Sequence, residues 1–346
     1  MPGKNIAIDL GTNSIKVYVK GRGIVMCQAN AISYDAHTDE IVAIGNSAKA
    51  MLERAPDTLE LVRPIRSGAI ADFSVMHQIL SSVIEHICKN EIFKPNVIIS
   101  APSSCTALEK KTIIDVCCAA GAGKVSVIDE PVASAIGCAM QIDRPHGTMV
   151  IDIGAGTSDI AIITMGTVAY SSSLRLGGDD MDDAICRYIK KEKDILIGMP
   201  TAEKIKNTIG CADESEEELE MSANGKDVVT GMPMMFTVTS KEISEALSDC
   251  ISLIIREVRS VLEQTPPELH ADICSDGIIL TGGVAKLKGL AQKLQKKFGV
   301  NIVVASDSEH TAAKGAGYAL KNMKNLEDNG YIFKLKEQDV LFVKSH

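Results

Sequence analysis

The chain has 346 residues, of which 45% are hydrophobic and 23% are charged, and its formal net charge is −9. This composition is typical of a folded globular protein and excludes a disordered chain, and the length allows two domains with sizeable cores. The acidic balance argues against general nucleic-acid binding.

The ten cysteines show no Cys-x-x-Cys pair, and no two histidines have His-x-x-x-His spacing. Cys117 and Cys118 lie in an apolar helical pattern, where small core residues are expected. The N-terminus carries no secretory signal, and no apolar run approaches the roughly 20 residues that span a bilayer. We therefore expect a soluble cytoplasmic protein with reduced thiols.

The first predicted element is a hairpin over residues 5–19, in which an apolar strand ends at Asp9 and Gly11. Polar residues with hydroxyl or amide groups follow, and a second apolar strand completes the hairpin. Glycine lets a turn present its backbone N–H groups to a ligand, because no side chain blocks close approach. A phosphate chain fits such a turn; a surface β-hairpin is the alternative.

Residues 21–70 hold short apolar segments, such as Ile41 to Ile44, that indicate a small insertion. Helical spacing of apolar residues predicts an amphipathic helix from Val75 to Cys88. A buried strand at residues 96–102 leads to a helix with the capping-box pair Thr106 and Glu109. A strand at residues 125–130 precedes another helix, so strands and helices alternate as in an α/β protein.

The central segment, residues 149–163, repeats the plan of the first hairpin: an apolar strand, Asp152, Gly154, Gly156 and a second strand. Thr157 and Ser158 add hydroxyl donors. Asp152 would hold Mg²⁺ beside the phosphates through water, since Mg²⁺ keeps much of its hydration. Two such hairpins about 140 residues apart predict two similar halves facing each other across a nucleotide cleft.

Further helices are predicted from the Gly177-Gly178 pair through Tyr188 and from Lys241 to Leu262. The acidic residues between positions 211 and 220 indicate a solvated loop. Residues 276–286 give a strand, the pair Gly282-Gly283 and a helix. Glycines at a strand-to-helix turn place free amides and the positive helix end near an anion.

The motifs together resemble the actin/DnaK/sugar-kinase ATPase superfamily, and within it the bacterial actin family of MreB and Mbl. The resemblance extends nearly from end to end and includes residues 18–25, 70–73, 94–95, 130–137, 171–173, 196–198, 201–206, 265–269 and 271–273. It implies an actin-like ATPase fold of two ribonuclease-H-like α/β domains, each with a smaller subdomain. Domain I is expected at 1–143, with subdomain IB near 33–68 and subdomain IA completed by 318–346. Domain II is expected at 144–317, with subdomain IIB near 181–255.

The resemblance also implies ATP and Mg²⁺ as cofactors, and it assigns residues by position. Asp9 and Asp152 would position the Mg²⁺, mainly through water, and Glu130 would orient or deprotonate the attacking water. An acid in the first turn of its helix is the alternative for Glu130. The residues expected to contact the nucleotide are Thr12, Asn13, Ser14, Lys16, Gly154, Ala155, Gly156, Glu203, Lys204, Ile205, Lys206, Gly282, Gly283, Val284 and Ala285.

Some positions depart from the family pattern: residues 11–16 are Gly-Thr-Asn-Ser-Ile-Lys, where the family usually has Gly-Thr-Ala-Asn-Thr-Leu. Lys16 replaces an apolar residue and could reach the β- or γ-phosphate as a point charge, or extend to the surface instead. Ala155 and Val284 each stand where the family has glycine. Nucleotide binding should survive these changes.

The family resemblance predicts a cytoskeletal ATPase that polymerises into filaments on the inner face of the cytoplasmic membrane and meets cell-wall synthesis proteins. Ile92 and Phe93 match an apolar membrane-inserting pair, with Lys89 and Lys94 beside them for anionic headgroups. The alternative is a non-polymerising chaperone or adaptor of the DnaK or EutJ type. A small-molecule kinase is a third hypothesis, although no acceptor site is evident.

Overall fold

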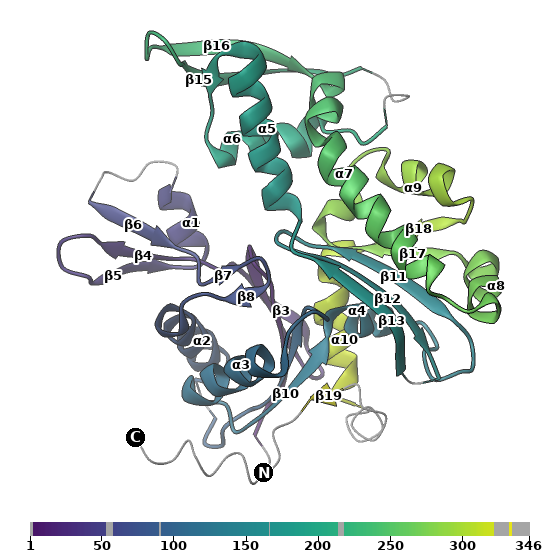
Figure 1. The fold of residues 1–346 in the computed structure, drawn as a ribbon. Coiled ribbons are helices and arrows are strands. Elements are labelled where there is room, and N and C mark those ends of the chain that lie inside the picture. Colours follow the sequence, from purple (N-terminus) through teal and green to yellow (C-terminus); the bar gives the residue numbers. More distant parts are fainter. Residues whose placement is uncertain are drawn as a thin grey trace. The chain divides into compact units, whose positions relative to one another are not determined.

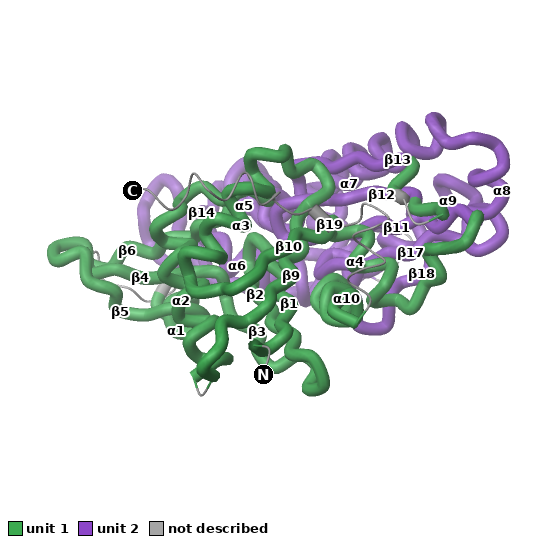
Figure 2. Tube along the Cα trace, turned by 90° about the horizontal axis from the view of Figure 1, so that it is seen from below, with its two compact units in different colours: residues 1–145, 163–169, 310–346 green, residues 146–162, 170–309 purple. Residues whose placement is uncertain are grey.

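The computed structural model describes residues 3–52, 58–89, 91–165, 167–213, 218–321 and 332–333. Its contacts divide the chain into two compact units (Figure 2). Unit 1 contains Met1–Pro145, Ile163–Ala169 and His310–His346, and unit 2 contains His146–Ile162 and Tyr170–Glu309. The domain and subdomain boundaries expected from the sequence stay predictions.

A six-stranded sheet forms the centre of unit 1 (Figure 1), and its strands follow the order β19-β10-β9-β1-β2-β3. β1 pairs in parallel with β9 and antiparallel with β2, and β9 pairs in parallel with β10. The strands are β1 (Asn5–Leu10), β2 (Ser14–Val19), β3 (Gly23–Ala29), β9 (Asn96–Ala101), β10 (Lys124–Asp129) and β19 (Ile332–Phe333).

Helices cover both faces of this sheet. α2 (Phe73–Cys88) and α3 (Ala107–Ala119) share one apolar core with Ile6 and Ile8 of β1. Successive side chains of a strand point to opposite sides, so each strand also presents a second face. α4 (Glu130–Gly137) and α10 (Thr311–Ala319) pack on that opposite face. The expected capping box of Thr106 and Glu109 is confirmed at the start of α3. Cys117 is buried as expected, whereas Cys118 is exposed.

The segment expected to be a small insertion, residues 21–70, only partly forms a sheet of its own in unit 1: its first part is β3, an edge strand of the central sheet, so the expectation was wrong there. Its strand order is β5-β4-β6, and a two-stranded ribbon, β7-β8, follows it. The elements are β4 (Ile32–Asp35), β5 (Ile41–Ile44), α1 (Asn46–Leu52), β6 (Leu59–Val62), β7 (Ile65–Arg66) and β8 (Ala69–Ile70).

Unit 2 is built on a five-stranded sheet in the order β13-β12-β11-β17-β18. If β11, β12, β13, β17 and β18 are matched to β1, β2, β3, β9 and β10, the two orders are the same. The repeated plan and the α/β class are therefore present in the fold. The strands are β11 (Thr148–Ile153), β12 (Ser158–Thr164), β13 (Thr167–Leu174), β17 (Ile278–Thr281) and β18 (Ile302–Val304).

Among the remaining elements of unit 2, α7 (Ser240–Glu263) is the longest helix, and its apolar side joins a large core. A three-stranded sheet, β14-β15-β16, lies among them. The other elements are α5 (Gly178–Lys193), β14 (Ile195–Leu196), α6 (Met199–Ile209), β15 (Glu220–Asp227), β16 (Pro233–Thr239), α8 (Pro267–Asp276), η1 (Gly283–Lys286) and α9 (Leu290–Phe298); η2 (Ser308–His310) leads out of the unit.

Two sequence expectations need correction in unit 2. The helix expected to end near Tyr188 continues to Lys193. The acidic run expected to be a loop ends in a strand, because Glu220 is the first residue of β15. Residues 214–217 of that run lie outside the described residues.

Candidate functional site

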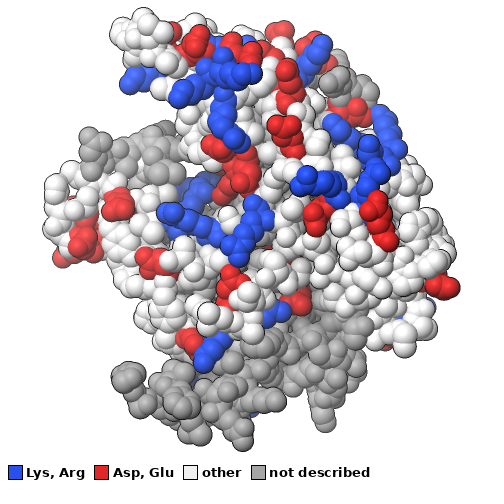
Figure 3. All heavy atoms as spheres, in the orientation of Figure 1, with Lys and Arg blue, Asp and Glu red and all other residues white. Residues whose placement is uncertain are grey.

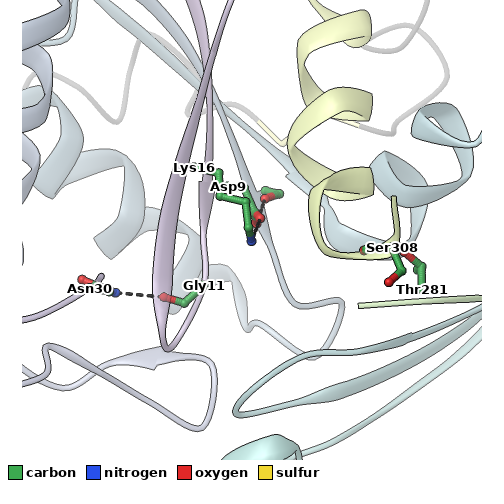
Figure 4. A network of polar contacts seen from close by, with 7 residues as sticks. Asp9, Gly11, Lys16, Asn30, Thr281 and Ser308 are labelled. Carbon is green, nitrogen blue, oxygen red and sulfur yellow. Dashed lines mark hydrogen bonds and ion pairs between the residues drawn. The ribbon is translucent and has the colours of Figure 1, made fainter. Parts of the chain in front are cut away.

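The first predicted phosphate loop is the turn between β1 and β2. The Gly11 N–H donates to the Ser14 carbonyl at 3.1 Å, which closes the turn. Asn30 braces it: its N–H donates to the Asn13 carbonyl at 3.0 Å, and its side-chain Nδ2 donates to the Gly11 carbonyl at 2.9 Å (Figure 4). Thr12, Asn13 and Ser14 stay partly exposed. No local sequence pattern marks Asn30 for this role.

Asp9 lies near the carboxyl end of β1 and is 3% exposed. Its Oδ2 lies 2.9 Å from Lys16 Nζ, and its Oδ1 accepts a hydrogen bond from Ser100 Oγ at 2.9 Å. Lys16 is held on β2, opposite Asp9 in the antiparallel register. Its side chain is only 14% exposed, so a lysine extended to the surface is ruled out.

Glu130 enters the same region from β10. Parallel strands β1, β9 and β10 end at one edge of the sheet, where Asp9 is in register with Ser100, and Asp129 with Ala101. Glu130 follows directly as the first residue of α4 and is half-buried. Burial by itself would lower the pKa of Lys16, but the charges of Asp9 and Glu130 raise that pKa above its ordinary value. Unit 1 thus gathers Asp9, Lys16 and Glu130.

Asp152 occupies the equivalent place in unit 2. It lies on β11, is 5% exposed and is in register with Thr281 of β17. The loop that follows is closed by the Gly154 N–H, which donates to the Thr157 carbonyl at 2.8 Å. Ser158 was expected to offer its hydroxyl to phosphate, but its Oγ donates to the Leu176 carbonyl instead. Thr281 Oγ1 donates to the Ser308 carbonyl at 3.0 Å (Figure 4).

Gly177 and Gly178, at the start of α5, pack closely against the second loop. The Gly178 N–H donates to the Gly154 carbonyl at 3.0 Å, and the Asp179 N–H donates to the Ala155 carbonyl at 2.8 Å. A Cβ atom on Gly177 would lie 2.5 Å from the Ala155 carbonyl oxygen. Only glycine permits this approach. The sequence alone predicts these two glycines merely as the start of a helix.

The four predicted nucleotide residues of α6 differ in accessibility. Ile205 is fully buried in the core of unit 2, so its side chain serves packing. Lys206 is largely buried and is bound to α5, through the Gly178 carbonyl and Asp182. Glu203 is partly exposed and Lys204 is exposed.

The predicted Gly282–Ala285 turn is a short 3-10 helix rather than the start of an α-helix. Gly282 has φ +88°, and a Cβ atom there would lie 2.2 Å from the Ile153 carbonyl oxygen. Gly283 is exposed, and a Cβ atom there would have nothing within 4 Å. Val284 and Ala285 are buried. The turn therefore combines a tightly packed glycine with an open one.

The residues present fit a nucleotide with Mg²⁺. Each unit offers a buried carboxylate next to a glycine turn, and Mg²⁺ is commonly held by one or two carboxylates together with substrate phosphates. Among the described residues there is no cluster of three His, Cys, Asp or Glu side chains that could hold a metal alone. The open space at Gly283 leaves room for a flat group against the backbone.

Acidic and basic side chains are interspersed over the described part of the face drawn in Figure 3. With a net charge of −9, the chain as a whole repels anions. Attraction for a phosphate chain must therefore come from local groups, namely backbone amides of the glycine turns and the ammonium group of Lys16.

The expected membrane pair lies in the loop between α2 and β9. Ile92 is 93% exposed and Phe93 is 52% exposed, so neither side chain is covered. Glu91, in the same loop, pairs with Lys4 at 3.2 Å. Asn90 lies outside the described residues, and no helix within the described ranges has the length and apolar composition to cross a bilayer.

Comparisons with known proteins agree over almost the whole chain. A family model described as MreB/Mbl protein matches residues 3–328. The chain is 40% identical over 327 residues to the cell shape-determining protein Mbl of Bacillus subtilis (strain 168), covering 94% of this chain and 98% of that protein. It is 39% identical to the cell shape-determining protein MreB of Escherichia coli (strain K12), covering 93% and 94%.

A solved structure shows the same likeness in three dimensions. MreB5 of Spiroplasma citri bound to ADP matches with a TM-score of 0.89 at 32% identity, covering 95% of this chain and 99% of that one. The same protein bound to AMPPNP matches with a TM-score of 0.88.

Proposed function

The chain belongs to the MreB/Mbl family of bacterial actin-like cytoskeletal proteins, and from this premise we propose that it is an ATPase that polymerises into filaments. The observation that carries the proposal is the repeated arrangement of a buried aspartate before a glycine turn, Asp9 in unit 1 and Asp152 in unit 2. The related MreB5 is bound to ADP in one structure and to AMPPNP in another, which supports an adenine nucleotide.

In this proposal the two glycine turns donate backbone N–H groups to the phosphates, while Asp9 and Asp152 position Mg²⁺ through its bound waters. Bound Mg²⁺ would neutralise charge that develops on the phosphates during hydrolysis. Lys16, held charged by Asp9 and Glu130, adds a fixed positive charge beside the first turn.

Glu130 is the group we propose to orient the attacking water. It is half-buried at the carboxyl edge of the sheet, beside the Asp9 and Lys16 pair. Attack on the γ-phosphate depends more on a positioned water than on a strong base, and a fixed carboxylate oxygen accepts one of its hydrogens.

We further propose that the filaments lie on the inner face of the cytoplasmic membrane and organise cell-wall synthesis and rod shape; the names of the relatives, cell shape-determining proteins, support the role in cell shape. The exposed Ile92 and Phe93 support the membrane contact. Two apolar side chains give weak affinity per subunit, and a filament multiplies such contacts.

High-speed pelleting with ATP and Mg²⁺ tests the proposal, with phosphate release measured in the same samples. The wild type should pellet above a critical concentration. Glu130→Ala should still pellet but release phosphate at least about a hundredfold more slowly. Glu268→Ala is the matched control, because Glu268 is also a first-turn acid next to a proline, in α8.

A loss of phosphate release in Glu268→Ala equal to that in Glu130→Ala would refute a special role for Glu130. A wild-type protein that binds ATP but never pellets would refute polymerisation and favour a non-polymerising adaptor of the same superfamily.

A further inference from the structure

Lys206 lies in a buried polar contact that joins α6 to the first turn of α5. Its Nζ donates to the Gly178 carbonyl at 2.8 Å and lies 2.8 Å from Asp182 Oδ1. The side chains of Lys206 and Asp182 are only 10% and 5% exposed. A buried ion pair adds little net stability after its desolvation, but it restricts the geometry of the groups it joins.

The first turn of α5 is also hydrogen-bonded to the second predicted phosphate loop. The Gly178 and Asp179 N–H groups donate to the carbonyls of Gly154 and Ala155. Gly178 thus donates through its N–H to the loop and accepts through its carbonyl from Lys206. A Cβ atom on Gly178 would lie 3.2 Å from Lys206 Nζ, 3.3 Å from Val284 Cγ2 and 3.7 Å from the Ala155 Cα.

Three segments with predicted nucleotide contacts therefore meet at this one glycine, namely the second loop, α6 and the 3-10 helix η1. A shift of the first turn of α5 would move the N–H groups of Gly178 and Asp179, which donate to the carbonyls of Gly154 and Ala155. The backbone N–H groups of that loop would then no longer point toward the predicted position of the phosphates.

We propose that Asp182 and Lys206 are a positioning pair, which fixes the second phosphate loop relative to α6 and to η1. This inference rests on the proposed ATP binding and deepens it. Lys206 then acts on the nucleotide through Gly178 and the loop, rather than by touching the base or the ribose. Asp182 holds the ammonium group in place for this contact.

The pair should respond to acid. The charged or titratable groups that act on Asp182 are Lys206 and Glu203 of α6 and Asp179 of α5, and Cys186 of α5 also senses its charge. Burial raises the pKa of Asp182 to about 6, although the charge of Lys206 opposes this change. Protonation of Asp182 below that pH removes the ion pair and loosens the turn.

The test compares AMP, ADP and ATP binding to Asp182→Asn, Lys206→Met and the double variant, with Mg²⁺ present. The double variant removes both charges, so it leaves no unpaired buried ion and should fold. Lys193→Met is the matched control, because Lys193 pairs with Glu242 at the other end of α5. Circular dichroism checks the fold of each variant.

We expect ADP and ATP affinity to fall roughly tenfold or more in the three variants, as is usual when a contact that orients a binding group is lost. AMP affinity should change less than about threefold, because AMP lacks the β- and γ-phosphates. The control should bind all three nucleotides as the wild type does. Between pH 7 and pH 5, wild-type ADP affinity should fall more than that of Asp182→Asn, while protonation of ADP itself affects both equally.

Equal losses for AMP and ADP would overturn the inference and make Lys206 a direct nucleoside contact. Unchanged ADP affinity in the folded double variant would also overturn it. A wild-type protein that binds none of the three nucleotides would instead refute the proposed function, so the two failures are distinguishable.

Discussion

Lys16 Nζ lies 2.9 Å from Asp9 Oδ2, and the two side chains are only 14% and 5% exposed. The family resemblance implies an apolar residue at position 16, whereas this chain has a buried cation next to the carboxylate proposed to position Mg²⁺. Ser100 Oγ donates a hydrogen bond to the other carboxylate oxygen of Asp9, Oδ1.

Lys16→Met should lower the free energy of unfolding of unit 1 by about 3 kcal/mol, because it leaves the Asp9 carboxylate buried without its cation. Urea denaturation at pH 7.5 measures the loss. Lys4→Met is the control: its pair with Glu91 is about one-third exposed, so its loss should cost less than about 1 kcal/mol. Equal costs for the two variants would contradict the stabilising role given to the buried pair.

The adjacent glycines of the η1 turn should respond oppositely to alanine. Gly282→Ala should destabilise the protein by about 3 kcal/mol or more, because φ is +88° and the new Cβ would lie 2.2 Å from a backbone oxygen. Gly283→Ala should change stability by less than about 0.5 kcal/mol, since the new methyl group meets only open space.

Gly283→Ala should nevertheless weaken ATP binding, if the nucleotide occupies that open space. We expect a loss of roughly five- to a hundredfold, which corresponds to ~1–3 kcal/mol of overpacking against the ligand. Isothermal titration calorimetry measures it. A folded Gly283→Ala variant with wild-type affinity would show that the nucleotide lies elsewhere.

Asp182 should also leave a signature in the pH dependence of stability. Its pKa is raised to about 6 in the folded state from an ordinary value of 3.8, so the folded state binds its proton more tightly. The stability from this group is complete below pH 3.8 and is lost as the pH rises through 6. The shift corresponds to about 3 kcal/mol.

Asp182→Asn cannot titrate, so its stability relative to the wild type should increase by up to about 3 kcal/mol between pH 4 and pH 7.5. Thermal or urea unfolding at several pH values gives this difference, and contributions from other carboxylates cancel in it. A constant difference across this range would mean that Asp182 has an ordinary pKa in the folded protein.

Ile92→Asp and Phe93→Asp should each reduce binding to anionic vesicles roughly tenfold, because each removes an apolar side chain from the lipid contact. Co-sedimentation with vesicles, together with ATP binding in solution, checks this. Val229→Asp is the matched control, since Val229 is 86% exposed and lies on unit 2. If Val229→Asp weakens vesicle binding as strongly, the loss reflects added charge rather than a specific membrane site.

Much of the fold could be predicted because apolar periodicity and glycine turns are local signals. The β1–β2 and β11–β12 hairpins, α2 and the capping box at Thr106 all follow from nearby residues. The β15–β16 hairpin is not predicted, because Glu220–Asp227 has only two apolar side chains, Met221 and Ala223; its pairing with β16 stabilises the strand. The actin-like fold implied by the family resemblance is confirmed by the likeness to MreB5.

Residues of the candidate site could be predicted from the sequence only where they belong to a local motif of consecutive residues. Asp9, Asp152 and the glycine turns belong to such motifs. Asn30, Ser100 and Asp182 reach their places through tertiary contacts, at sequence separations of 19, 91 and 24 positions from Gly11, Asp9 and Lys206. No local pattern marks these contacts, and the glycine at position 178 gains its role only when α6 packs against α5.

Unit 1 also constrains the order in which the newly made chain can fold. Gly315 of α10 lies so close to α4 that a Cβ atom there would be 1.6 Å from the Ala133 carbonyl oxygen, and a Cβ atom on Gly317 would be 2.3 Å from the ring of Tyr18. One face of the central sheet is therefore covered by α4 alone, without α10, until residues 311–319 have been synthesised. At about 5–20 residues per second, synthesis from residue 145 to residue 319 takes roughly 9–35 s. During that interval the face of the central strands that α10 contacts is left partly uncovered.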